Sequence, residues 1–174
     1  MVRGRNAAND VARIEVDGDI PPSFHLGGLP YFGYRLAVTA KLFDRKFVEI
    51  LKAHSTLTLP QWRCVAQLGL AEPGTVRSLA EGAVVDRAEV SRALARLVAQ
   101  GLVARNGNLG DQRSPQFTLT PAGRALFARL RQPVSEFIGS LIDHVAASDI
   151  EAADRVLWAV SRGCMDQGPR NSVI

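Results

Sequence analysis

The sequence is poor in the residues that build covalent or metal-dependent scaffolds. Its 174 residues include only two cysteines, Cys64 and Cys164, too few for a disulfide framework or a cysteine zinc site. The three histidines, His25, His54 and His144, are scattered without the spacing of metal ligands. We therefore expect no metal and no cofactor.

Long apolar runs are also missing. No stretch reaches the length that spans a bilayer, and residues 1–19 lack the apolar core of a signal peptide. There is no Ser-His-Asp or Cys-His arrangement, no glycine-rich phosphate loop and no recognisable pair of catalytic acids. We expect a cytoplasmic protein that is not an enzyme and has no membrane partner.

Lysine is scarce among the basic residues. The chain has 21 basic and 17 acidic residues, a net charge of +4, and 18 of the basic residues are arginine. Residues 75–124 hold seven arginines and four acidic residues, whereas the three lysines are Lys41, Lys46 and Lys52. A positive excess is compatible with nucleic acid or acidic ligands, and its concentration in one segment favours a few positioned arginines that contact DNA.

Apolar residues recur at helical spacing in the first half of the chain. They predict a helix over residues 33–53 and a second helix that starts at the N-cap Thr58. A short third helix follows the cap Thr75 and ends at Gly82, and a fourth begins at the cap Asp86 and is closed by Gly101. Its expected buried stripe is Val90, Leu94, Leu97 and Val98.

After residue 101 the sequence pattern becomes typical of β-strands, and from residue 121 it is again typical of helices. Residues 102–105 and 117–120 indicate a hairpin with a long polar tip. A helix starts at Pro121, and Pro133 is expected to kink or split it. A last helix is expected to begin at the cap Ser148. The fold class is therefore mainly α with a small β-hairpin wing, a winged helix-turn-helix with N- and C-terminal dimerisation helices.

A helix-turn-helix pattern alone is also typical of ordinary core helices, and the hairpin with Arg113 in its tip is what favours DNA. The sequence resembles the MarR family of dimeric winged-helix transcription regulators over residues 34–165. The matching elements are Leu59-Pro60-Gln61-Trp62-Arg63, Asp86-Arg87, Val90-Ser91-Arg92, Leu97, Gly101-Leu102-Val103-Ala104-Arg105, Asp111-Gln112-Arg113 and Leu119-Thr120-Pro121-Ala122-Gly123.

The fourth helix carries the candidate DNA contacts. Arginine can donate two hydrogen bonds to guanine, and serine can donate or accept. Glu89 either caps its own helix or accepts from a cytosine amine, and the first turn offers backbone N–H groups to phosphate. A solvated helix face with no ligand is the other interpretation of this surface. The predicted contacts, with Arg87 and Arg92 foremost, are Arg87, Ala88, Glu89, Ser91, Arg92 and Arg96.

The wing and the third helix supply further candidates. Asp111 can hold Arg113 in position, and the resemblance implies that this arginine reaches into a minor groove. The alternative is a surface ion pair of little energetic value. Arg77 and Arg105 are candidate phosphate contacts, which would set affinity and its salt dependence more than sequence choice.

The outer helices predict a second copy of the chain as partner. Their apolar stripes exceed what one winged helix covers, and pairing would set two recognition helices one DNA turn apart. Each apolar position could instead belong to the core of one chain. The expected organisation is an arm and aromatic connector at 1–32, a single domain at 33–165 with dimerisation helices at 33–54 and 121–165 and the DNA-binding lobe at 57–120, and a tail at 166–174.

The resemblance also implies a pocket for a small effector, of aromatic or phenolic acid type, that changes the spacing of the recognition helices. The candidates are Phe24, His25, Tyr31, Tyr34, Trp62 and Arg63. These residues could instead seal the dimer, an interpretation that weighs more for Trp62, and Arg63 could pair with a nearby acid. Cys64 is expected to be a buried hydrophobic residue.

These observations together predict a ligand-responsive homodimeric repressor that binds a pseudo-palindromic operator in double-stranded DNA. The alternative is a winged helix that binds a protein partner without specific DNA binding. Arg92, Asp111 and Arg113 favour the first hypothesis.

Overall fold

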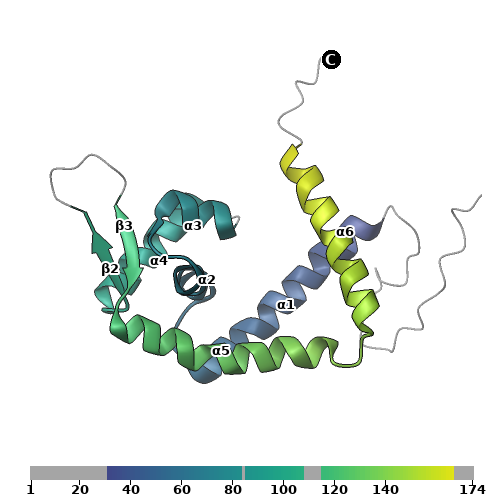
Figure 1. Cartoon of the computed structure of the whole chain (residues 1–174), viewed down its shortest axis with the longest axis horizontal. Coiled ribbons are helices and arrows are strands. Elements are labelled where there is room, and N and C mark those ends of the chain that lie inside the picture. The colour runs from purple at the N-terminus through teal and green to yellow at the C-terminus, as the bar shows by residue number, and fades with distance from the viewer. Residues whose placement is uncertain (1–30, 84, 108–114, 167–174) are drawn as a thin grey trace, which may run out of the picture. The chain divides into compact units, whose positions relative to one another are not determined.

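The computed structural model describes residues 31–83, 85–107 and 115–166. Two compact units divide between Leu130 and Arg131. In chain order the elements, which Figure 1 labels, are α1 (Phe32–His54), α2 (Leu59–Leu70), β1 (Gly74–Thr75), α3 (Val76–Ala83), α4 (Arg87–Ala99), β2 (Val103–Asn106), β3 (Gln116–Leu119), α5 (Pro121–Ile142) and α6 (Ala147–Asp166). The mainly helical fold with a small antiparallel sheet confirms the predicted fold class.

The first unit is built around α2. This helix packs against α3, α4 and β3, and Figure 1 shows it end-on among them. Its N-terminus is fixed by Thr58, whose backbone N–H donates to Gln61 Oε1 over 2.9 Å, which confirms the expected cap. The largest fully buried side chains among the described residues are all aliphatic: Leu51, Leu68, Leu94, Leu97, Leu130, Val65 and Val103.

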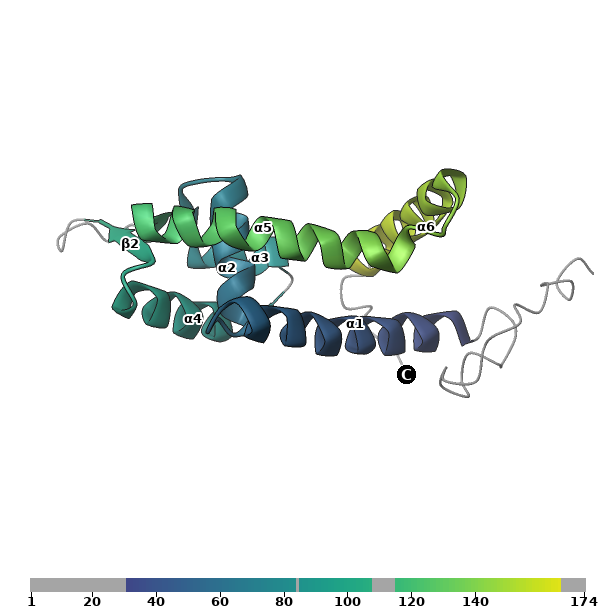
Figure 2. The ribbon, with the colours of Figure 1, turned by 90° about the horizontal axis from the view of Figure 1, so that it is seen from below.

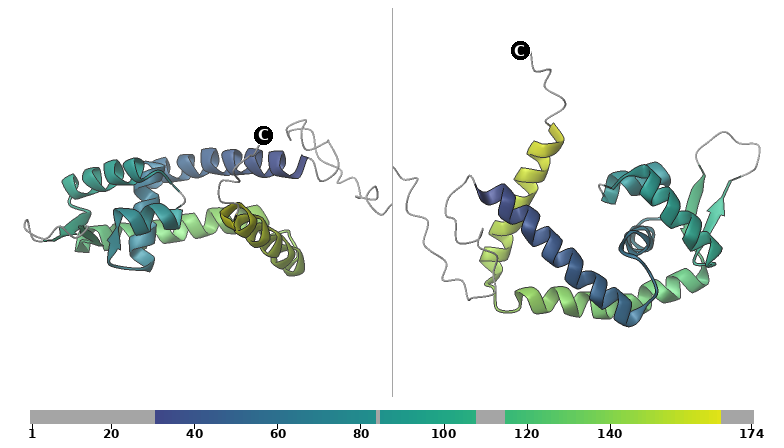
Figure 3. Two further views of the ribbon diagram at one scale, coloured as in Figure 1. Left: turned by 90° about the horizontal axis from the view of Figure 1, so that it is seen from above. Right: turned by 180° about the vertical axis from the view of Figure 1, so that it is seen from behind.

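The sheet has three antiparallel strands in the order β1-β3-β2. β2 and β3 form the predicted hairpin, with Val103 opposite Leu119 and Asn106 opposite Gln116. They lie side by side in the right-hand view of Figure 3. The short strand β1 was not predicted, because two residues show no alternation of apolar and polar side chains.

Two expected helix boundaries and one expected buried position were wrong. Gly82 does not end α3, which continues to Ala83, because a terminating glycine needs a positive φ and Gly101 is the one described glycine that has it, at 70°. Ser148 lies inside α6, where the Ala146 carbonyl accepts from the N–H of Ile150 instead. Val98 is 37% exposed and does not belong to the buried stripe of α4.

The second unit contains the end of α5 and the whole of α6. The helix α5 runs unbroken through Pro133, so this proline does not split it (Figure 2). No residue of α6 is buried. Within the three described ranges, no helix is both long and apolar enough to cross a membrane.

Candidate nucleic-acid interface

The helix α4 has two different faces. Val90, Ala93, Leu94 and Leu97 are buried against the rest of the first unit. The opposite side consists of exposed polar and small side chains, among them the predicted contacts Arg87, Ala88, Ser91, Arg92 and Arg96. The two sets alternate at helical spacing, so α4 has one exposed face. On this face Arg92 and Arg96, four residues apart, form the arginine row, and Arg87 lies at the opposite edge, toward α3.

Asp86 fixes the start of this helix, as predicted. Its Oδ1 accepts hydrogen bonds from the backbone N–H groups of Ala88, at 2.7 Å, and Glu89, at 3.3 Å. The expectation that the first turn offers free N–H groups to phosphate was wrong for these two residues, because the cap already satisfies them. Recognition at this end of α4 therefore depends on side chains.

A groove of about 260 Å³ runs beside the arginine row, between α4 and the first turn of α2. Glu89 is half-buried and lines it, so its carboxylate lies on the same surface as the guanidinium groups. The remaining lining residues are Thr58, Pro60, Gln61, Arg92, Ala93 and Arg96. A row of arginines over a shallow groove suits a polyanion better than a compact small molecule.

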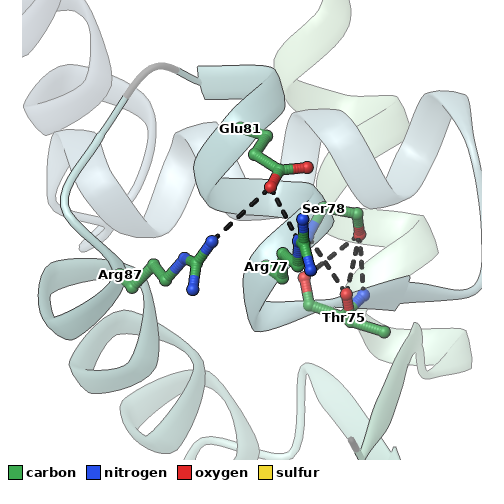
Figure 4. A network of polar contacts seen from close by, with 5 residues as sticks. All are labelled: Thr75, Arg77, Ser78, Glu81 and Arg87. Atoms are coloured by element: carbon green, nitrogen blue, oxygen red, sulfur yellow. Dashed lines mark hydrogen bonds and ion pairs between the residues drawn. The ribbon is translucent and has the colours of Figure 1, made fainter. Parts of the chain in front are cut away.

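The predicted phosphate contact Arg77 lies in α3 and is not alone. Its Nε donates to Glu81 Oε1 over 2.8 Å, and Nη2 of Arg87 lies 3.6 Å from the same oxygen. Figure 4 shows the two guanidinium groups on either side of the one carboxylate. Sequence inspection did not single out Glu81, although its spacing of four residues from Arg77 is that of a helical ion pair.

The wing is described at its base. Arg105 is exposed on β2, and Asn106 Nδ2 donates to Thr118 Oγ1 across the hairpin over 3.1 Å. The predicted tip residues Asp111 and Arg113 lie outside the described residues. The base of the wing thus presents one of the predicted arginines to solvent, from a paired strand.

Glu72, also missed in the sequence, ties the base of the wing to α5. Its Oε1 accepts from the backbone N–H of Leu119 over 2.6 Å, and its Oε2 accepts from Arg124 Nη1 over 2.5 Å. Burial raises the pKa of this carboxyl, but the hydrogen bonds from Arg124 and Leu119 outweigh that effect and hold the pKa below its ordinary value. Glu72 is therefore ionised and paired at neutral pH.

Hydrogen bonds at the base of the wing explain the element Leu119-Thr120-Pro121-Ala122-Gly123. Thr120 Oγ1 donates to the carbonyl of Gly101 over 2.7 Å and accepts from the N–H of Gly123 over 3.1 Å. A Cβ on Gly123 would lie 2.0 Å from the Leu102 carbonyl oxygen, so only glycine fits. The motif joins the end of α4, the wing and the start of α5.

Comparisons with known proteins agree with this architecture. The family model described as MarR family matches residues 57–114. The chain is 34% identical over 90 residues to the homoprotocatechuate degradative operon repressor of Escherichia coli, covering 52% of this chain and 60% of that protein. The crystal structure of a mutant MarR from Escherichia coli complexed with operator DNA matches with a TM-score of 0.65 at 26% identity, over 74% of this chain and 91% of that one.

Over residues 57–114 this chain is similar to the MarR family. These relatives are transcriptional regulators and not enzymes, which confirms the expectation from the sequence. The chain spans 60% of the length of the curated relatives it matches. A Staphylococcus aureus MarR in complex with salicylate and kanamycin shares the fold, with a TM-score of 0.71 at 16% identity over 80% of this chain and 93% of that one.

The described residues that were predicted to bind an effector do not form one cluster. Tyr31 and Tyr34 are 40% and 58% exposed near the start of α1. Arg63 pairs with Asp44, ten residues further along α1 than Tyr34, or about 15 Å at 1.5 Å per residue. Phe24 and His25 lie outside the described residues. One protomer alone therefore does not bring the two tyrosines to Arg63.

Trp62 belongs to the core of the first unit. It is 7% exposed, and its ring lies 6.4 Å from that of Phe47 and 6.1 Å from that of Phe127. These distances are typical of aromatic packing and place the indole between α1 and α5. Arg63, in contrast, is partly exposed and takes the acidic partner that the sequence left as one of two possibilities.

Cys64 is buried, as expected of a small hydrophobic residue. Burial, reinforced by the nearby Glu89 carboxylate, raises the pKa of its thiol to about 11. A thiol that stays protonated at neutral pH is a poor nucleophile. The described residues also contain no group of three or more histidine, cysteine or acidic side chains placed to hold a metal ion.

Proposed function

We propose that the protein is a homodimeric, cytoplasmic repressor that binds a pseudo-palindromic operator and is released by an aromatic or phenolic acid. The observation that carries the DNA-binding part is the exposed face of α4, which presents Arg87 at one edge and Arg92 and Arg96 at the other, on a helix whose remaining side is buried. Arginine matches guanine edges and phosphates in a major groove, and Ser91 adds a second kind of polar contact on the same face.

The dimer is supported by apolar surface in the second unit. Trp158 is 62% exposed and Val156 is 47% exposed, on a helix without a buried residue. Many large apolar side chains exposed on so short a unit indicate a surface that a partner covers. Its further large apolar members are Ile138, Leu141, Ile142, Val145, Ile150 and Leu157. A second copy of the chain would cover such a surface symmetrically.

The test of DNA binding starts with selection of a duplex from a random pool by the wild-type protein. Arg92→Ala should weaken binding to the selected duplex at least tenfold, because a bidentate base contact is worth about 1–3 kcal/mol. Arg113→Ala, at a position that the sequence predicts in the wing tip, should do the same. Arg155→Ala, which removes an exposed arginine from α6, is the matched control and should bind as wild type.

Size-exclusion chromatography with light scattering measures whether each variant is still a dimer. Unchanged binding by both the Arg92 and Arg113 variants contradicts the proposal. If no duplex is selected, and binding is absent even at low salt, the alternative of a protein-interaction module is favoured instead. Wild-type protein that is monomeric at micromolar concentration contradicts the dimer.

For the effector we propose Arg63 as the anion contact. Its guanidinium bridges to Asp44 over 3.0 Å with both side chains more than a third exposed, so a ligand carboxylate can compete with Asp44 for it. A groove of about 490 Å³ adjoins Asp44 on α1. Exchange of one anion for another would loosen the contact between α1 and α2 and shift the population of DNA-competent dimers. The salicylate complex of the Staphylococcus aureus relative supports this ligand class.

Salicylate and homoprotocatechuate are suitable probes. Each should raise the melting temperature and release the selected duplex from wild-type protein, and Arg63→Met should abolish both effects. Arg45→Met, which removes the guanidinium next to Asp44 in the sequence and leaves Arg63 in place, is the control that should retain them. A full response from the Arg63 variant would contradict the assignment.

A further inference from the structure

The carboxylate of Glu81 is shared by two arginines from different helices. Oε1 of Glu81 accepts from Arg77 within α3 and lies 3.6 Å from Arg87, which opens α4 (Figure 4). The three groups carry a net charge of +1 rather than the +2 of the arginines alone. Glu81 thus couples the two helices of the helix-turn-helix through their basic side chains.

All three side chains are well exposed: 73% for Arg77, 63% for Arg87 and 57% for Glu81. Exposed ion pairs contribute little to stability, so this network is not explained by folding. It lies instead where the predicted phosphate contact and a predicted base contact meet. We therefore expect the network to affect how Arg77 and Arg87 contact DNA, and not how stable the fold is.

The backbone under both arginines is fixed independently of Glu81. Thr75 Oγ1 accepts from the N–H of Ser78 over 3.0 Å, and Ser78 Oγ accepts from the N–H of Thr75 over 2.9 Å, which caps α3 beside Arg77. Asp86 caps α4 beside Arg87. Since the Cα positions are set by these caps, removal of Glu81 frees the guanidinium groups without moving the helices.

We propose that Glu81 is a positioning residue for DNA recognition. It holds the Arg87 guanidinium in one position for a base contact and the Arg77 guanidinium in one position for a phosphate contact. Its negative charge also weakens the attraction of both arginines to phosphates at other positions on the DNA. Attraction to phosphates grows with the number of free cations, whereas choice among sequences depends on where a guanidinium is held. Glu81 therefore increases discrimination at the expense of general affinity. This inference rests on the proposed DNA-binding function.

The experiment compares the dissociation constants of the selected duplex and of a scrambled duplex of equal length and composition, by fluorescence anisotropy at several salt concentrations. In Glu81→Gln the scrambled duplex should bind about threefold to tenfold more tightly, and its log–log salt slope should steepen by about one, because the loss of one carboxylate lets one further arginine reach a phosphate. The selected duplex should change by less than about twofold. The ratio of the two constants should therefore fall about threefold to tenfold.

Two further variants separate positioning from charge. Glu81→Asp keeps the charge but withdraws the carboxylate by one methylene, and it should still lower the ratio. Glu49→Gln removes the same charge, and an equally exposed ion pair to Lys46 at 2.7 Å, from α1. It should leave the ratio unchanged. Both Glu81 variants should melt as wild type, since the side chain is exposed.

A double variant identifies the residue through which Glu81 acts. In an Arg87→Ala background, Glu81→Gln should lower the ratio no further. An unchanged ratio in both single Glu81 variants, or an equal fall with and without Arg87, overturns the inference. Wild-type protein that selects no duplex overturns the proposed function itself, and this inference with it; selection by wild type with unaltered discrimination in the variants overturns the inference alone.

Discussion

Arg63 Nη2 donates to both carboxylate oxygens of Asp44, at 3.0 and 3.1 Å, and so connects the second helix of the molecule to the first. Nineteen residues separate the two side chains in the sequence. The preceding residue of α2, Trp62, packs against Phe47 of α1. An exposed ionic contact and a buried aromatic contact thus both join α1 to α2.

The energetic value of this pair should be small. Because both side chains are more than a third exposed, solvent screens the attraction, and we expect a coupling energy of about 0.5–1 kcal/mol. A double-mutant cycle of Asp44→Asn and Arg63→Met, followed by urea unfolding, measures it. Trp62→Ala should cost about 3–5 kcal/mol in the same assay, because the ring is buried. A coupling above about 2 kcal/mol would contradict the view that a ligand can replace Asp44 at low cost.

Gly123 should tolerate no side chain. The added Cβ of an alanine would clash with the Leu102 carbonyl oxygen. Gly123→Ala must therefore move the start of α5 away from the wing, at a cost of about 1–3 kcal/mol. Gly139→Ala, also within α5 but with nothing within 4 Å of its Cβ, should instead stabilise by about 0.5–1 kcal/mol. Urea unfolding of the two variants compares them directly. Equal effects at the two positions would refute the steric explanation.

The elements that could be predicted from the sequence are those with a local cause. Thr58 and Asp86 were identified as helix caps because a cap needs only its own next three residues. The arginine row of α4 followed from helical spacing in the same way. Local rules, however, do not tell whether a glycine adopts a positive φ, and so Gly82 was mistaken for a helix end.

The rest depended on pairing between distant segments. Glu72 meets Leu119 forty-seven residues later, and β1 exists only because β3 lies beside it. Arg63 had two possible partners in the sequence, and only the fold brings Asp44 to it. Glu81 lies four residues from Arg77, but its contact with Arg87 requires the turn between α3 and α4. Polar contacts between distant segments can be assigned only when the positions of the helices relative to one another within the unit are known.

The two cysteines should differ sharply in reactivity. Cys164 is exposed, whereas Cys64 is buried and its pKa is raised to about 11. At pH 8 a thiol reagent such as DTNB should modify one cysteine per chain rapidly and the second only after unfolding. Cys164→Ala should remove the rapid phase. A rapid reaction that survives in this variant would contradict the burial of Cys64.

The raised pKa also has a consequence for stability at alkaline pH. The unfolded chain releases the Cys64 proton near its ordinary pKa of 9.0, but the folded chain keeps it until about pH 11. The folded state therefore binds more protons in this interval, and the contribution of Cys64 to stability should fall as the pH rises from about 9 to 11. The difference in unfolding free energy between wild type and Cys64→Ala, measured at pH 7, 9 and 10, should decrease along the series. A constant difference would contradict it.

Glu72 should contribute to stability in the opposite pH range. Its pKa is lowered in the folded protein, so its contribution is present above the ordinary value of 4.5 and is lost as the pH falls through the folded value. Glu72→Gln keeps an oxygen to accept from the Leu119 N–H but loses the charge that meets Arg124. We expect a loss of about 1 kcal/mol at pH 7, since a charged hydrogen bond with a mostly covered carboxylate is worth more than a fully exposed pair. At pH 3 the difference between wild type and the Glu72 variant should be smaller than at pH 7, and Glu136→Gln, which removes an exposed carboxylate from α5, is the control for the loss of a charge alone. If the Glu72 variant differs from wild type equally at both pH values, the ionised carboxylate is not what fastens the wing to α5.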